Sequence, residues 1–152
     1  MRAHSTHKLL LASAILLMGA ATAFTQERKS AAERINGVWR MDPRTLRSPT
    51  LTSYQEDGTV TFTQLEDGRF SAIARITTRM VSKTDETFNI PGCENETECT
   101  IDSASEGIAS VFGNSMYVDW IDEGWIDDFF KISGNEMDGD DGNGPIHLVK
   151  VE

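Results

Sequence analysis

The amino-acid sequence predicts an all-β protein, an antiparallel up-and-down meander closed into a small barrel of about eight strands, with a short N-terminal helical turn. Three observations lead to this fold class. Runs of β-branched and aromatic residues recur along the chain. Turn-forming residues separate these runs at intervals of roughly ten residues, and no long helical crossover connects them. Closure is expected because a barrel leaves no exposed sheet edge.

The first 23 residues have the pattern of a secretory signal peptide. A basic segment from Arg2 to Lys8 precedes an uncharged, Leu- and Ala-rich run, and Ala21-Thr22-Ala23 supplies an A-x-A cleavage pattern. The apolar run is shorter than the roughly 20 residues that a membrane-spanning helix needs, so a cleaved signal is preferred to an uncleaved anchor. We therefore expect residues 24–152 to form a single β-barrel domain that is secreted or periplasmic and is not inserted in a membrane.

The elements are expected in the following order. Residues 25–35, charged and Ala-containing, predict the helical turn. Strands are expected in the runs 35–41, 51–55, 59–65, 69–81, 86–90, 107–112, 115–121, 125–132 and 146–152. Asp57-Gly58 and Asp67-Gly68 precede two of these runs and predict hairpin turns, because glycine adopts the positive φ that such turns require. Alternation in the run 69–81 predicts one buried face, formed by Phe70, Ala72, Ala74 and Ile76.

Acidic residues are concentrated in the second half of the chain. The formal net charge is −10, and residues 94–141 hold fourteen acidic residues against Lys131 alone. Such a chain repels phosphates, so nucleic acid is not an expected partner. The acidity is either a well-solvated surface or a site for a cationic protein surface.

Cys93 and Cys99 are the two cysteines of the chain. At this short spacing, in a secreted protein, they predict a disulfide that stabilises the fold by no more than about 2–3 kcal/mol, because the loop it closes is small. The alternative is a metal site that adds Glu94, Glu96 and Glu98. It is less favoured because carboxylates are harder ligands than a thiolate site usually includes.

A G-x-W pattern, Gly37 and Trp39, stands at the start of the first expected strand. It resembles the first-strand motif of lipocalin-like (calycin-type) small β-barrel proteins, which enclose small apolar ligands. The resemblance implies that Trp39 packs across the barrel floor and that a basic residue near the last strand, here Lys150, covers it. The chain departs from the family pattern in lacking an aromatic residue at Thr84–Glu86 and a late arginine.

Several activities are excluded by missing motifs. His147 is the one histidine after the signal segment, which rules out zinc sites built on two or three histidines. Phosphate-binding, dinucleotide-binding and G-x-S-x-G patterns do not occur. His147 lies in an alternating strand and is expected to be solvent-facing or hydrogen-bonded. No cofactor is expected, and catalysis is less favoured than binding, although paired carboxylates leave a hydrolase open.

The segment DGDDGNG, residues 138–144, is rich in oxygen ligands and carries the calcium candidates Asp138, Asp140 and Asp141. The EF-hand spacing is not met, because the twelfth position is Val149 in place of glutamate. A calcium site of another kind remains an interpretation. A turn-rich connection before the last strand is preferred, since Gly and Asp favour turns.

Residues 115–132 predict a β-hairpin. A three-residue loop, Asp122-Glu123-Gly124, is preferred to a two-residue Glu-Gly loop because it separates the apolar face from the polar one. That register turns Asp128 inward, on the face that carries Met116, Val118, Trp120, Ile126, Phe130 and Ile132.

An inward carboxylate needs a partner, because an unpaired buried charge costs several kcal/mol. We expect the partner of Asp128 to be an arginine such as Arg75 or Arg79, backbone amides, or a polar ligand. Two interpretations follow, an internal salt bridge or the polar end of an aromatic-aliphatic cavity. The candidate ligand-binding residues are Asp128, Trp120, Phe130, Trp39 and Arg75.

The function expected from these features is non-enzymatic binding of a small apolar or amphipathic ligand by a secreted, lipocalin-like protein. A second possibility is an acidic protein-interaction or inhibitor module, with a filled barrel and an exposed aromatic-acidic patch. A third is a carboxylate-based hydrolase, which requires two carboxylates converging in a cleft.

Overall fold

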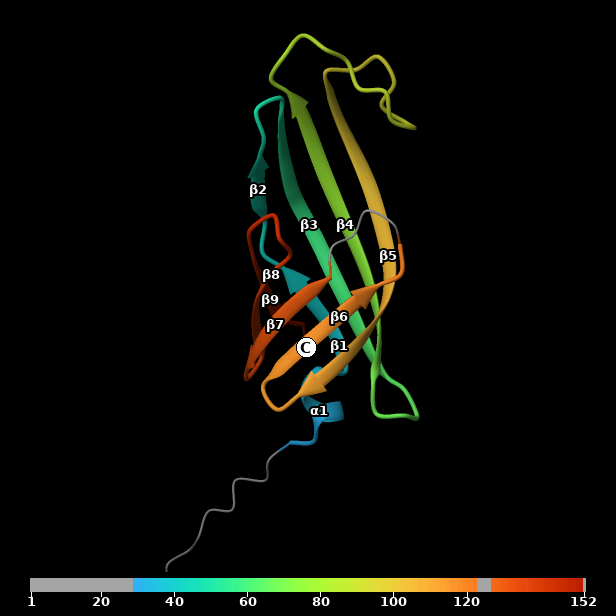
Figure 1. Cartoon of the computed structure of the whole chain (residues 1–152), viewed down its shortest axis with the longest axis vertical. Helices are drawn as coiled ribbons and strands as arrows, with labels where there is room; N and C mark the ends of the chain where they lie inside the picture. The colour runs from blue at the N-terminus through green and yellow to red at the C-terminus, as the bar shows by residue number, and fades with distance from the viewer. Residues whose placement is uncertain (1–28, 123–126, 152) are drawn as a thin grey trace, which may run out of the picture.

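The computed structural model describes residues 29–122 and 127–151 (Figure 1). Within these residues there are one short helix and nine strands: α1 Ala31–Ile35, β1 Gly37–Met41, β2 Arg44–Arg47, β3 Leu51–Gln64, β4 Phe70–Ser82, β5 Glu98–Phe112, β6 Ser115–Trp120, β7 Asp128–Ser133, β8 Glu136–Asp140 and β9 Pro145–Lys150. The expected signal segment, residues 1–23, lies outside the described residues. In the part of the chain that is described, no helix is long and apolar enough to cross a membrane.

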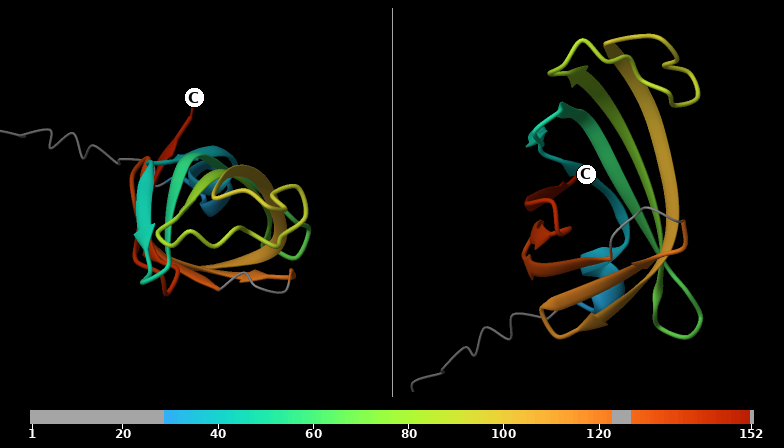
Figure 2. Two further views of the ribbon diagram at one scale, coloured as in Figure 1. Left: turned by 90° about the horizontal axis from the view of Figure 1, so that it is seen from above. Right: turned by 45° about the horizontal axis from the view of Figure 1, so that its top comes forward.

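The strands form one antiparallel sheet that closes into a barrel. Their order is β1-β9-β8-β7-β6-β5-β4-β3, and β1 pairs with β3 to close the ring of eight (Figure 2). β2 is an additional strand that pairs with the first part of β3, Arg44 opposite Gln55 and Arg47 opposite Thr52. The predicted fold class is confirmed.

Three strands are much longer than the others. β3, β4 and β5 contain 14, 13 and 15 residues, and they extend together beyond the barrel (Figure 1). At the far end of these strands a small apolar cluster forms around Met80, Cys93 and Cys99. Cys93 and Cys99 lie at disulfide-bonding distance, with a Cα–Cα separation of 5.7 Å.

The helix α1 covers the opposite end of the barrel. It begins with a capping box, in which the Ser30 hydroxyl accepts from the Glu33 amide and the Glu33 carboxylate accepts from the Ser30 amide. Trp39 is fully buried, and its Nε1 donates to the Ile35 carbonyl at 2.9 Å. The Lys150 ammonium lies 5.7 Å from the Trp39 ring centroid and donates to carbonyls at the end of α1. Trp39 and Lys150 thus lie together at the end of the barrel that α1 covers.

The core lies inside the barrel because successive strand residues point alternately inward and outward. Phe70, Ala72 and Ala74 are buried and Ile76 packs against them, so the predicted inner face of the run 69–81 is confirmed. The largest fully buried side chains are Trp39, Phe62, Phe70, Phe130, Ile35, Met116, Met137, Leu148 and Val118.

One of the two predicted hairpin turns was wrong. Asp57-Gly58 does not form a hairpin turn, because β3 continues through it with a register irregularity between Gln55 and Asp57. Both halves of β3 pair with the continuous strand β4, so the chain has no reason to reverse there. A Cβ at Gly58 would lie 2.6 Å from Cε of Met41 and 3.2 Å from its Cβ, so a larger residue fits here only if the flexible Met41 side chain shifts. The other predicted turn is present, with Gly68 at φ 83°.

The strand boundaries also differ from the expected ones elsewhere. Residues 86–90 form no strand and belong to the loop between β4 and β5. β2 and β8 were not predicted, because their short polar sequences, RTLR and EMDGD, show little apolar alternation. The first half of β5 was missed for the same reason, since its residues are mostly polar on both faces.

Candidate functional site

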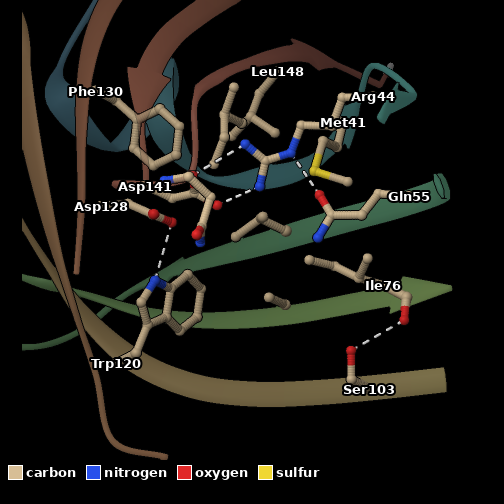
Figure 3. A pocket seen from close by; sticks show the side chains of 14 residues that line it. Met41, Arg44, Gln55, Ile76, Ser103, Trp120, Asp128, Phe130, Asp141 and Leu148 are labelled. Atoms are coloured by element: carbon tan, nitrogen blue, oxygen red, sulfur yellow. Dashed lines mark hydrogen bonds and ion pairs between the residues drawn. The ribbon is translucent and has the colours of Figure 1, made fainter. Parts of the chain in front are cut away.

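A cavity of about 180 Å³ lies inside the barrel, at the end from which β3, β4 and β5 extend (Figure 3). Every barrel strand except β8 contributes to it, together with β2 and the connection between β8 and β9. Its apolar wall is formed by Met41, Val60, Ala74, Ile76, Phe130, Ile146 and Leu148. Its polar and aromatic groups are Arg44, Gln55, Ser103, Trp120, Asp128, Asp141 and Asn143.

The hairpin of β6 and β7 brings Asp128 to this cavity. Met116 pairs with Phe130 and Val118 pairs with Asp128, which is the register preferred from the sequence. Because Phe130 points inward, Asp128 two residues earlier points inward as well, and it is 6 % exposed. The tip of the predicted loop, residues 123–126, lies outside the described residues.

The electrostatics of Asp128 are unusual for a carboxyl group. Its Oδ2 accepts a hydrogen bond from Nε1 of Trp120 at 3.0 Å, and both side chains are buried. Burial raises the pKa of Asp128 to about 7, against the lowering effect of the Trp120 hydrogen bond. The negative charge of Asp141 raises this pKa further, and the positive charge of Arg44 lowers it.

Arg44 and Asp141 form an ion pair at the polar wall of the cavity (Figure 3). Their side chains are 12 % and 14 % exposed. Arg44 Nη1 also donates to the carbonyls of Gly144 and Pro145 at 3.2 and 3.3 Å, and its Nε donates to Oε1 of Gln55. This network ties β2 to the β8–β9 connection, so it fixes the part of the cavity wall that lies next to β7.

The structure brings three of the five predicted ligand-binding residues together. Asp128, Trp120 and Phe130 line the cavity. Trp39 does not, because it is packed under α1 in the closed end of the barrel. Arg75 is exposed on the outer face of β4, as its alternation with Ala74 requires, so it does not reach Asp128.

Arg79, the other predicted partner of Asp128, is occupied elsewhere. It forms ion pairs with Glu56 and Glu98 at 2.8 and 3.0 Å, and its guanidinium stacks 4.2 Å from the ring centroid of Tyr54. The expectation that Arg75 or Arg79 pairs with Asp128 was therefore wrong. The hydrogen bond comes from Trp120, and the arginine whose charge acts on Asp128 is Arg44.

The three calcium candidates have separate roles. Asp138 hydrogen-bonds the ring of His147 at 2.7 Å, Asp140 accepts from the Gly142 amide, and Asp141 pairs with Arg44. Among the described residues, no group of three or more His, Cys, Asp or Glu side chains is placed to hold a metal ion. The expected turn is shorter than predicted, because Asp138 and Asp140 belong to β8.

Arg44 and Gln55 were not identified from the sequence. Arg44 stands in a short polar run after Pro43, and nothing local distinguishes it from the exposed arginines nearby. The one feature of the sequence that could have pointed to Arg44 is its place in a short segment between two predicted strands. The contact with Asp141 joins residues 97 positions apart and depends on closure of the barrel.

Fold and site together define a class, a closed antiparallel β-barrel with an internal cavity that has one buried carboxylate in its wall. Comparison of the chain with protein-family models and with curated proteins found no match.

Proposed function

We propose that this protein is a secreted or periplasmic, lipocalin-like, non-enzymatic binding protein that holds a small amphipathic ligand inside its barrel. The observation that carries the proposal is the cavity itself, in which an apolar wall faces Asp128, Gln55 and the indole of Trp120. Ligand sites are typically concave and mostly apolar, with a few polar groups that orient the ligand.

The size of the cavity limits the ligand. A cavity of roughly 150 Å³ is large enough to bind benzene, and this one is about 180 Å³. The proposed ligand is therefore about the size of a single ring with one polar substituent. A long-chain lipid would not fit without movement of the wall.

Two substitutions test whether the cavity binds a ligand. Ala74 is buried and lines the cavity, whereas Ala104 is exposed on the outer face of the neighbouring strand. Ala74→Leu fills part of the cavity, and Ala104→Leu adds the same atoms outside it.

The measurement is native mass spectrometry of protein purified from its own source. A small molecule should remain with the wild-type protein and with Ala104→Leu, and should be lost from Ala74→Leu. An apo mass for all three proteins, or equal retention by both variants, would contradict the proposal.

A protein-interaction module is the second candidate, because apolar side chains are exposed on the outer face of the same hairpin. Tyr117 and Phe129 lie opposite each other and are 39 % and 57 % exposed, and Ile121 is 71 % exposed. Asp119 and Asp140 flank them, so a cationic protein surface is the complementary partner. A basic amphipathic peptide should then bind the wild-type protein and Ala74→Leu, but not Phe129→Ser.

The carboxylate-hydrolase alternative would use Asp128 and Asp141, the two acidic side chains among the described residues that line the cavity. Asp141 accepts two hydrogen bonds from Arg44. A carboxylate held in this way is poorly placed to take or give a proton, which favours binding over hydrolysis.

A further inference from the structure

We propose that the ligand of the barrel cavity is a small organic cation, an amine on an apolar body of about one ring, and that its ammonium group binds the carboxylate of Asp128. This inference rests on the small-ligand function proposed above and names the chemistry of the ligand.

The first step is that Arg44, the one cationic side chain among the described residues that line the cavity, is already paired with Asp141. Its Nη1 and Nη2 donate to the two carboxylate oxygens of Asp141, and Nε donates to Gln55. Two backbone carbonyls accept further hydrogen bonds from Nη1. An anionic ligand would have to displace Asp141 from this network, so the cavity does not offer a ready site for a carboxylate or phosphate.

The second step is that Asp128 is only partly satisfied. The carboxylate has about four lone-pair sites, and the hydrogen bond from Trp120 Nε1 is the one that its oxygens accept from the described residues. The side chain is 94 % buried and faces the cavity. An ammonium group placed in the cavity would supply both the missing donors and the missing positive charge.

The charges around Asp128 favour the same sign of ligand. Among the described residues, the charges that act on Asp128 are those of Asp141, Arg44 and Asp127. Arg44 and Asp141 neutralise each other, and Asp127 accepts hydrogen bonds from the Tyr117 hydroxyl and the Trp120 amide. With Asp128 ionised, the cavity wall therefore carries a net negative charge.

The aromatic groups are suited to a cation as well. Asp128 lies between the rings of Phe130 and Trp120, both of which line the cavity (Figure 3). A cation near the face of an aromatic ring is attracted by its negative quadrupole. The formal net charge of −10 would also concentrate cations near the protein.

Three probes of similar shape and different charge test the proposal. Benzylamine is cationic, benzyl alcohol is neutral and benzoate is anionic. Binding to the full domain is followed by isothermal titration calorimetry at pH 8, and NMR signals of the Trp120 indole and the Met41 methyl report whether the probe enters the cavity. The matched variants are Asp128→Asn and Asp119→Asn, which remove one charge inside and one charge outside the barrel.

We expect benzylamine to bind at least about tenfold more tightly than benzyl alcohol, as is usual for a charged hydrogen bond. This preference should disappear in Asp128→Asn and remain in Asp119→Asn. If benzyl alcohol or benzoate binds in the cavity as tightly as benzylamine, the cation inference is wrong while the ligand-binding function stands. If no probe shifts the cavity signals, both proposals are contradicted.

A second measurement uses the wild-type protein alone and does not depend on the folding of a variant. A lysine-like amine is protonated throughout pH 5.5 to 8. Because the pKa of Asp128 is about 7, affinity for benzylamine should fall about tenfold for each pH unit below about 7. Asp128→Asn keeps Arg44, Asp141 and Asp127, so its pH profile should be flat. A flat profile in the wild-type protein would overturn the inference.

Discussion

Replacing Asp128 by asparagine should make the barrel more stable at neutral and alkaline pH. Asparagine keeps an oxygen that can accept from Trp120 Nε1, but it has no charge to bury. The pKa of Asp128 is about 7 in the folded barrel, against an ordinary value of 3.8. At about 1.4 kcal/mol per pH unit, this gap corresponds to about 4 kcal/mol of folding free energy.

The direction of the pH dependence follows because the folded state binds the Asp128 proton more tightly than the unfolded state does. Between about pH 4 and pH 7 the folded protein keeps the Asp128 proton, whereas the unfolded chain has lost it. The contribution of the Asp128 proton to the free energy of unfolding is therefore fully present below about pH 4, and it is lost as the pH rises through about 7. The advantage of Asp128→Asn over the wild-type protein should grow from near zero at pH 4 to about 4 kcal/mol at pH 8.

Urea unfolding followed by circular dichroism at several pH values measures this difference. Taking the difference between variant and wild type removes the contribution of the other carboxylates. Asp119→Asn is the control, because Asp119 is exposed on the outer face of the same hairpin. Equal pH dependence of Asp128→Asn and the wild-type protein would refute the reasoning, since it would mean that Asp128 is not held in a low-dielectric environment.

Three further perturbations follow from the same structure. Arg44→Ala leaves the largely covered Asp141 without its cation and should destabilise the fold by about 3 kcal/mol in urea unfolding. Arg69→Ala breaks an exposed pair with Asp67 and should leave the unfolding midpoint almost unchanged. The hydrogen bond to Asp138 raises the pKa of His147. This bond therefore stabilises the fold at acidic pH, and the stabilisation is lost as the pH rises through the raised pKa of His147. In Asp138→Asn, the pKa of His147 measured by NMR titration should return toward about 6.5. Replacing Cys93 and Cys99 together by alanine should cost about 2–3 kcal/mol and leave probe binding unchanged, because the pair lies outside the barrel cavity.

The strongly alternating segments were predictable because they carry their own register. In the run 69–81 and in the β6–β7 hairpin, the apolar residues repeat every second position, so the buried face follows from the sequence. This is why the alternation alone predicts that Asp128 points inward and that it shares a face with Trp120 and Phe130. Its consequence, a buried carboxylate that needs a partner, is a matter of elementary electrostatics.

Segments with weak alternation were not predictable in the same way. β2, β8 and the first half of β5 are polar, and they are strands because neighbouring strands offer backbone hydrogen bonds. The same limit explains the error at Gly58, where Asp-Gly indicates a turn but β4 provides a continuous partner. Local sequence preferences are overridden when neighbouring strands supply the hydrogen bonds that the backbone N–H and C=O groups need.

The all-β class, the preferred register of the β6–β7 hairpin and the need of Asp128 for a partner follow from the residue pattern alone. The groups that surround the Asp128 carboxylate do not follow from it, because they come from distant segments. Arg44 and Asp141 are 97 residues apart and meet because β1, which precedes Arg44, pairs with β9, which follows Asp141. The cavity is likewise a property of closure, since its volume depends on side chains from seven barrel strands that no local pattern relates to one another.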